Sequence, residues 1–458
     1  MPSLCEWSER SFMLEMKPKN ELAALYVDCP PVSTKQEKNE TNKNGTDCDK
    51  ITEVVRVGDH YLELTEEEVC DDNDGVHRKD SGISSNCEPC SRYYAFIEDV
   101  SLDPKTLSGF TWMDQNRLFM CRIKAVTEGQ YLRPKTNARI EKEILSFVDI
   151  KEFVEDFREE EKYMFCNECK TQIHVASPDV EIKIMPNDTY LENSSSSFDF
   201  YCRTSCDGHA FNTEKAYKEH EEKIMEFLPS KNKMVLSCSF VLLNKKDIDE
   251  KYFSPGETKQ NVLCCSKCLV ELGCNMTNYQ DCYKFYHSAV TFTTASMISS
   301  KIVNRPTNFI EYKFETMERY FAYLLLSQSE NDGTSKVVVR SLEGKPHMFI
   351  WIYEPYVVMT SGSLKKKDET TNNTDDESDH VKSFAALKVM YKIFDSDMAI
   401  YDSKAQGCDP SAGTLEMPQN ACLKFMELLL INSHAFPPSF RLLGQFCVSF
   451  LKLNNIRQ

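Results

Sequence analysis

Two Cys-x-x-Cys pairs constrain this 458-residue chain more than any other feature of its sequence. The first pair is Cys166 and Cys169, and the second is Cys265 and Cys268. Each pair follows apolar residues, as the knuckles of a zinc ribbon do, and a Cys-x-x-Cys turn presents two sulfurs to one metal ion. The sequence therefore predicts one structural zinc site with four cysteine ligands, and the 95 residues between the pairs must form a folded insertion.

Buried free thiols are the alternative interpretation of these cysteines, because cysteine is often fully buried. A redox pair fits less well, since neither pair opens a helix in a βαβ pattern. Two pairs with similar flanking residues favour zinc. A further group, Cys202, Cys206 and His209, lies between the pairs in YCRTSCDGHAF. These residues could ligate a metal here or in a partner's active site, or they could belong to an ordinary polar loop.

The composition argues against a protein that binds nucleic acid directly or spans a membrane. A formal net charge of -17 opposes the basic surface that phosphate contacts need. No apolar run reaches the roughly 18 residues of a membrane span, and the N-terminal MPSLCEWSER does not have the pattern of a signal peptide. We therefore expect a soluble intracellular protein, whose 20 cysteines are thiols, ligands or nucleophiles rather than disulfides.

Strand-like segments dominate the chain. Segments rich in β-branched and aromatic residues predict strands at 181–186, 234–243, 287–294, 335–342, 347–359 and 385–394. Fewer segments have helical spacing, and these lie at 139–161, 316–328 and 421–434. The sequence thus predicts an α+β, strand-dominated fold, with antiparallel sheets, a few packed helices and a zinc-ribbon-like pair of knuckles.

Changes in composition divide the chain into three expected regions. They are a β-rich region at 1–138, a zinc-knuckle region with the inserted Cys/His loop at 139–292, and an α+β region at 293–458. Polar segments that are poor in aromatic residues cannot bury enough apolar area to become ordered. They predict disordered insertions at 33–53, 65–92 and 361–382.

One cysteine near the C-terminal end has the setting of a nucleophile. Cys422 lies at the start of an apolar helix, and Asn420 is the expected N-cap. The positive end of a helix lowers a thiol pKa and raises the thiolate fraction, as a nucleophile that accepts an acyl group requires. The alternative is a core position, because Leu423 and Leu430 indicate a core-facing helix.

Several blocks occur in the order found in one known family: FCNECK, VLCCSKCLVELG, KFYHSAVTF, HMFIWIYEPYVV, AALKVMYKIF and ACLKFMELLLINSHAFPPSFRLLGQFCVSFLKL. Over roughly residues 139–458 the chain resembles the HECT-like E3 ubiquitin-protein ligases, known for binding the cyclin-selective ubiquitin-conjugating enzyme (E2). The resemblance implies a HECT-type ubiquitin transferase, which accepts ubiquitin from an E2 as a cysteine thioester and passes it to substrate lysines, cyclin-type proteins among them, for proteasomal degradation. It also implies a cytoplasmic and nuclear location.

The resemblance assigns roles to individual residues. True HECT domains carry their acceptor cysteine in a Leu-Pro-x-x-x-Thr-Cys-like stretch, which corresponds here to 417–422, so Cys422 is the expected acceptor. Ala421 replaces the threonine of that pattern, and Asn455 stands where HECT enzymes place an aromatic residue. The E2 contact of the family falls at about 293–318. Its expected apolar contacts are Phe309, Ile310 and Tyr312.

The same resemblance implies an alternative function without catalysis. The family is implicated in binding the metallo-endonuclease of messenger-RNA 3′-end processing, as an inhibitor or an assembly factor. Its Cys/His loop resembles the segment that holds Cys202, Cys206 and His209, and thiolate and imidazole are good zinc ligands. Here Asp207 and Gly208 separate the cysteine from the histidine, which are adjacent in the family.

Overall fold

The computed structural model describes most of the chain in separate ranges. These are residues 6–29, 52–67, 91–115, 117–129, 132, 150–156, 160–188, 190–191, 222, 224–276, 279, 281–294, 308–366, 380–395, 402–407 and 409–453. None of the helices in these ranges is long and apolar enough to cross a membrane.

The chain folds into two compact units, each assembled from separate stretches. Unit 1 comprises 1–136, 354–388 and 430–458, and unit 2 comprises 137–353 and 389–429. The units divide the chain at other positions than the three regions predicted from composition.

Unit 1 is built from strands, and β1 lies in the middle of its larger sheet. The order of strands in this sheet is β24-β25-β22-β19-β1-β2-β7-β6. β1 pairs antiparallel with both β19 and β2 and is buried along nearly its whole length. A smaller sheet has the order β20-β5-β4-β3, with β21 parallel to β5. The bounds are β1 (Ser11–Lys17), β2 (Leu22–Asp28), β3 (Thr52–Val57), β4 (Tyr61–Glu67), β5 (Arg92–Glu98), β6 (Val100–Met113), β7 (Leu118–Thr127), β19 (Pro346–Ser363), β20 (Lys365–Lys366), β21 (His380–Lys382), β22 (Phe384–Ile393), β24 (Leu442–Leu443) and β25 (Phe446–Lys452).

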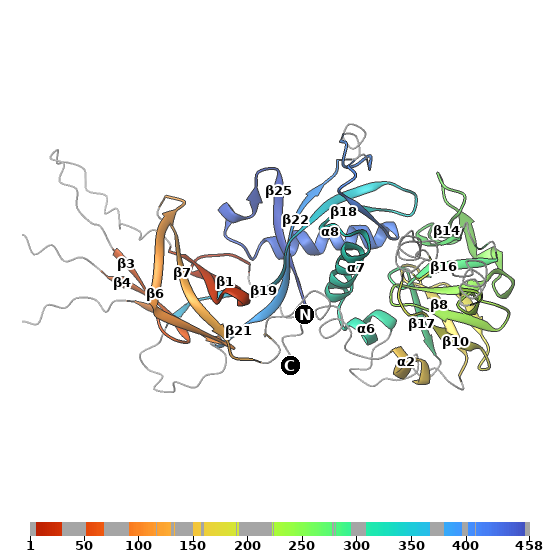
Figure 1. Ribbon diagram of the computed structural model, residues 1–458, viewed down its shortest axis with the longest axis horizontal. Helices are drawn as coiled ribbons and strands as arrows, with labels where there is room; N and C mark the ends of the chain where they lie inside the picture. The colour runs from red at the N-terminus through yellow and green to blue at the C-terminus, as the bar shows by residue number, and fades with distance from the viewer. Residues whose placement is uncertain are drawn as a thin grey trace, which may run out of the picture. The chain divides into compact units, whose positions relative to one another are not determined.

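Unit 2 contains two further sheets, which carry the Cys-x-x-Cys pairs. One has the order β10-β11-β12-β16-β15-β14-β13 and the other β17-β8-β9. Their strands gather in the green and yellow part of Figure 1. The bounds are β8 (Lys162–Cys166), β9 (Gln172–Ala176), β10 (Glu181–Ile184), β11 (Lys233–Leu236), β12 (Phe240–Asn244), β13 (Phe253–Pro255), β14 (Val262–Cys265), β15 (Glu271–Asn275), β16 (Cys282–Tyr286) and β17 (Val290–Thr294).

The helices of unit 2 pack with a short group of strands. β18 (Lys336–Arg340) pairs antiparallel with the first half of β19 and parallel with β23 (Gly413–Glu416). The helices are α2 (Ile150–Asp156), α6 (Phe309–Phe314), α7 (Met317–Asp332) and α8 (Gln419–Ser433), of which α8 continues into unit 1. Phe321 of α7 stacks on Phe425 of α8, with ring centroids 4.4 Å apart, so these two helices share one apolar contact surface.

The predicted fold class is confirmed, because antiparallel strands dominate the described residues and helices are few. Each predicted strand segment contains a strand, and 234–243 is a hairpin of β11 and β12. The helices predicted at 316–328 and 421–434 are α7 and α8. The helix predicted at 139–161 is described only as α2, and the first residues of that segment lie outside the described ranges.

The limits of the predicted insertions need correction. The segment 361–382 begins with the end of β19 and with β20, and it ends with β21. The segments 33–53 and 65–92 likewise include residues of β3, β4 and β5. Ladder pairing to neighbouring strands orders these polar residues, which composition alone does not show. The remaining residues of all three insertions lie outside the described ranges, apart from residues 91 and 364.

An aromatic cluster joins α6 to the end of β16. The ring of Phe309 stacks on that of His287 at 4.0 Å and meets Phe153 edge to face at 5.1 Å. His287 is 2% exposed, and its Nε2 lies 3.1 Å from the carbonyl oxygen of Ser237. Burial disfavours the charged imidazolium and lowers the pKa of His287 from 6.5 to about 4. The ring is therefore neutral at physiological pH.

This neutral histidine predicts acid sensitivity. The unfolded chain takes up the His287 proton at higher pH than the folded chain, so stability falls as the pH drops from 6.5 toward about 4. Between pH 7 and pH 5 we expect a loss of about 2 kcal/mol from this group, measured by urea unfolding. In His287→Gln the slope should be shallower but not flat, because burial also lowers the pKa of His174 and His347. An unchanged slope would contradict this account.

Candidate metal centre and the start of helix α8

The four cysteines of the two pairs converge at one point in unit 2. Their sulfurs all lie within 4.8 Å of one another. The Cys166 and Cys268 sulfurs are 3.6 Å apart, and so are those of Cys169 and Cys265. A tetrahedron with Zn–S bonds of about 2.3 Å has S···S edges of about 3.8 Å, whereas a disulfide bond is about 2.05 Å long. The predicted convergence is confirmed, and this group could hold a metal ion.

Two hairpins of the same construction present these sulfurs. The first pair lies at the turn between β8 and β9, and the second at the turn between β14 and β15. In each, the amide of the first cysteine donates to the carbonyl five residues later, at 2.9 Å. The amides of Lys170 and Leu269 donate back to the carbonyls of Cys166 and Cys265, at 3.0 and 2.8 Å. The two turns are therefore locally equivalent, although they belong to different sheets.

Both turns hold a residue in the left-handed region directly after the second cysteine. Lys170 has φ 57° and Leu269 has φ 62°. A side chain in this conformation costs about 1–2 kcal/mol, because its Cβ crowds the backbone. The Leu269 side chain is 67% exposed, so packing returns little of this cost. The left-handed conformation instead closes each turn, in which the two sulfurs of the pair point toward the same site.

The first knuckle is also fixed to the turn between β16 and β17. The amide of Asn167 donates to the carbonyl of Ala289 at 2.9 Å, and its Nδ2 donates to that of Ser288 at 3.0 Å. The Thr291 hydroxyl donates to Asn167 Oδ1 at 2.5 Å. Backbone and side chain of one residue thus anchor the hairpin of Cys166 and Cys169.

The second knuckle is bound to the start of α8 through Glu271, the first residue of β15. This carboxylate is 6% exposed and accepts the amide of Gln419 at 2.7 Å. It also accepts the amides of Leu342 and Glu343, each at 3.2 Å. Burial raises the pKa of Glu271, and the three amide donors oppose this shift. One buried carboxylate therefore joins the second knuckle, α8 and the turn after β18.

The first knuckle reaches the same helical turn through Asn420. Its Nδ2 donates to Glu168 Oε2, between the first two cysteines, at 3.2 Å. The prediction that Asn420 caps α8 is therefore wrong, because this residue lies inside the helix. The carbonyl of Pro418 accepts the amides of Ala421 and Cys422, at 2.9 and 3.1 Å. Both knuckles thus contact the first turn of α8.

Cys422 is sealed in the core of unit 2. Its side chain has no exposed surface, and its thiol lies 3.5 Å from the carbonyl oxygen of Arg340 and 3.6 Å from that of Met417. Burial, and secondly the charge of Glu271, raise the pKa of this thiol far above its ordinary value. The expectation that the helix N-terminus lowers this pKa is wrong, because desolvation outweighs the helix dipole.

The predicted partner-binding residues do not form an exposed binding surface within the described ranges. Phe309 and Ile310 are 2% and 4% exposed, so their side chains belong to the core and are not accessible to an E2. Tyr312 is half-buried and meets Phe153 at 4.9 Å between ring centroids. The predicted partner-binding residues Cys202, Cys206 and His209 lie outside the described ranges.

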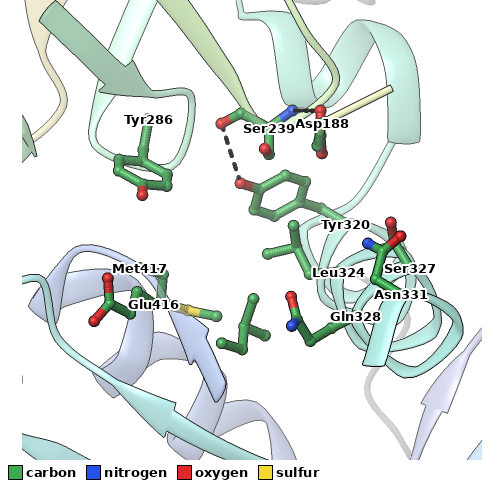
Figure 2. A pocket seen from close by; sticks show the side chains of 11 residues that line it. Asp188, Ser239, Tyr286, Tyr320, Leu324, Ser327, Gln328, Asn331, Glu416 and Met417 are labelled. Carbon is green, nitrogen blue, oxygen red and sulfur yellow. Dashed lines mark hydrogen bonds between the residues drawn. The ribbon is translucent and has the colours of Figure 1, made fainter. Parts of the chain in front are cut away.

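A small cavity lies between the seven-stranded sheet, α7 and the segment 415–417. Figure 2 shows Tyr286, Tyr320 and Asp188 on one side and Met417 on the other. Burial raises the pKa of both phenols, which are therefore neutral. The cavity volume is about 60 Å³, which is room for a few water molecules and not for a substrate.

A family model described as HECT-like ubiquitin-conjugating enzyme (E2)-binding matches residues 125–448, well over half of the chain. The chain belongs to this HECT-like E2-binding family. No curated protein and no solved structure matched it. The matched residues include both Cys-x-x-Cys pairs and all of α8. Membership in the HECT-like family supports a role in the ubiquitin pathway, with an E2 as partner.

Sequence reasoning on this family member missed Glu168 and Glu271. Glu168 lies within FCNECK and is exposed, and an exposed acid gives no sequence signal of a specific partner. Glu271 interrupts the apolar run of VLCCSKCLVELG, and a carboxylate inside a buried strand usually has strong partners. That interruption could have indicated a buried polar contact, but its partner, 148 residues away, has no signal in the sequence.

The left-handed residues of the knuckles give a stability prediction. Leu269→Gly should raise the free energy of unfolding by about 0.5–1 kcal/mol in chemical denaturation, since glycine adopts φ 62° without strain. Lys267→Gly is the matched control, because Lys267 is exposed in the same turn without positive φ. It should destabilise by a similar amount. If Leu269→Gly instead lowers the free energy of unfolding as much as Lys267→Gly does, the Leu269 backbone is not strained.

Proposed function

We propose that this chain is an E3-type factor, which binds an E2 and promotes transfer of ubiquitin to substrate lysines. The family match over residues 125–448 carries this proposal. It spans the knuckles and α8, and those elements form a continuous hydrogen-bonded assembly within unit 2.

The burial of Cys422 supports direct transfer from the E2 in this conformation. In that reaction a lysine amine attacks the thioester carbonyl of ubiquitin on the E2. An isopeptide bond forms, the carbon–sulfur bond breaks, and the E2 cysteine leaves as a thiol with the proton of the amine. The route through a Cys422 thioester, which the resemblance implies, requires an accessible thiolate. The sealed thiol does not meet that requirement.

A discharge assay tests the proposal. An E2 is first charged with ubiquitin, and free lysine is then added with or without the chain. We expect the chain to accelerate loss of the E2 thioester at least several-fold and to form no reductant-sensitive ubiquitin adduct. Cys422→Ala should retain this rate, with only about 1 kcal/mol lost in stability.

Two results would overturn the proposal. If none of a panel of E2 enzymes binds the chain or discharges faster in its presence, the E3 assignment fails. If a reductant-sensitive adduct forms and disappears in Cys422→Ala but not in Cys447→Ala, the thioester route replaces direct transfer. Cys447 is the matched control, because it is a half-buried cysteine of β25, in unit 1.

We further propose that the four converging cysteines hold one zinc ion. Four thiolates form a donor set that zinc prefers, and the sulfur separations of 3.6 Å match a tetrahedral site. When bound, zinc supplies a structural crosslink and no open position for catalysis. Cys166, Cys169, Cys265 and Cys268 would be its ligands.

Metal analysis of the purified chain should give one zinc per molecule. Cys169→Ser should reduce this content at least tenfold and lower the thermal midpoint, since structural zinc contributes directly to folding. Cys264→Ser adjoins the second pair without belonging to the four-sulfur group, and it should retain its zinc. Well under one zinc in the wild-type chain, with no gain when zinc is added during refolding, would rule the site out.

A further inference from the structure

The hydrogen bonds at the first turn of α8 connect it to both halves of the cysteine site. Glu168 lies between Cys166 and Cys169, and it accepts from Asn420 at 3.2 Å. Glu271 follows Cys268 by three residues, and it accepts the Gln419 amide at 2.7 Å. Each acid belongs to one of the two cysteine hairpins, so its position depends on the position of that hairpin.

The two contacts differ in strength. Glu271 is almost fully buried and accepts three backbone amides, which leave no room for water as a substitute. The Glu168–Asn420 contact is exposed, so water can replace it at little cost. Glu271 is therefore the main attachment between the cysteine site and α8, and Asn420 is the minor one.

Cys422 lies within the turn that these contacts hold. Its sulfur contacts the carbonyl oxygens of Arg340 and Met417, which come two residues before Leu342 and Gln419, whose amides Glu271 accepts. Access to this thiol requires the first turn of α8 to move away from the turn after β18. The Glu271 carboxylate joins these two parts directly.

We propose that Glu271 and Asn420 are positioning residues. They hold the first turn of α8 against the metal-bound knuckles and thereby keep the Cys422 thiol inaccessible to solvent. Loss of the metal frees the knuckles, releases the first turn of α8 and uncovers the thiol. This proposal rests on zinc binding by the four cysteines. It assigns the site a regulatory role, because the residue that resembles a HECT acceptor becomes reactive only in the metal-free chain.

Site-resolved thiol labelling tests the proposal. The full chain is treated with a maleimide at neutral pH, before and after removal of zinc with a chelator under reducing conditions. Mass spectrometry then reports the labelling rate of each cysteine. We expect Cys422 to be protected in the zinc-bound chain and labelled at least tenfold faster after zinc removal. Cys282 is buried in the seven-stranded sheet, and it should stay protected in both states.

Three substitutions separate positioning from the metal itself. Glu271→Gln should label at Cys422 roughly tenfold faster with zinc still bound, the effect expected on losing charged hydrogen bonds at a helix start. Asn420→Ala should give a smaller increase. Glu427→Gln is the matched control, because it removes the same charge from an exposed position of α8, and it should label like the wild type.

The outcomes are distinct. If Cys422 stays protected after zinc removal, or in Glu271→Gln, the positioning role is wrong even though zinc binds. If Cys282 and Cys422 become labelled together, the chain unfolds globally and no local release exists. Absence of zinc from the wild-type chain would instead refute the metal centre itself. Labelling confined to Cys422, with zinc retained in Glu271→Gln, would support the proposal.

Discussion

The convergence of four cysteine sulfurs is the constraint on which the arrangement of unit 2 depends. Each hairpin belongs to a different sheet, and the four sulfurs of the two turns lie within 4.8 Å of one another. Three contacts with other elements start within a few residues of these cysteines: Asn167 holds the turn after β16, Glu168 meets α8, and Glu271 joins α8 to the turn after β18. The site therefore organises elements that come from distant parts of the chain.

The electrostatics at the start of α8 show why a favourable helix position does not make a nucleophile. The positive end of the helix is occupied by the Glu271 carboxylate, which takes the first amide. The dipole thus stabilises an oxygen anion, while the same charge raises the pKa of the neighbouring thiol. Burial is the larger cause of the raised pKa, and the Cys422 thiol donates to backbone carbonyls. Desolvation, together with the nearby carboxylate, keeps the Cys422 thiol neutral despite its place at the helix start.

Local patterns in the sequence predicted what local interactions determine. The Cys-x-x-Cys spacing located both knuckles, and period-two alternation located the strands, because each depends on a few adjacent residues. Contacts between distant residues were not accessible in this way. Phe309 and Ile310 were predicted at a surface but are buried, and Phe309 packs against His287 and Phe153. The environment of Cys422 depends on Glu271, which no pattern near the C-terminal helix reveals.

The separation of the two knuckles has a consequence for how the protein is made. Cys166 and Cys268 are 102 residues apart, so on the order of 5–20 s of synthesis separates their emergence from the ribosome. During that interval the first hairpin exposes two thiols that can take up other metals or become oxidised. The entropy of closing a loop grows only slowly with its length. Insertions between the knuckles therefore weaken the finished site little. Each added residue, however, lengthens the period in which the first cysteine pair exists without the second.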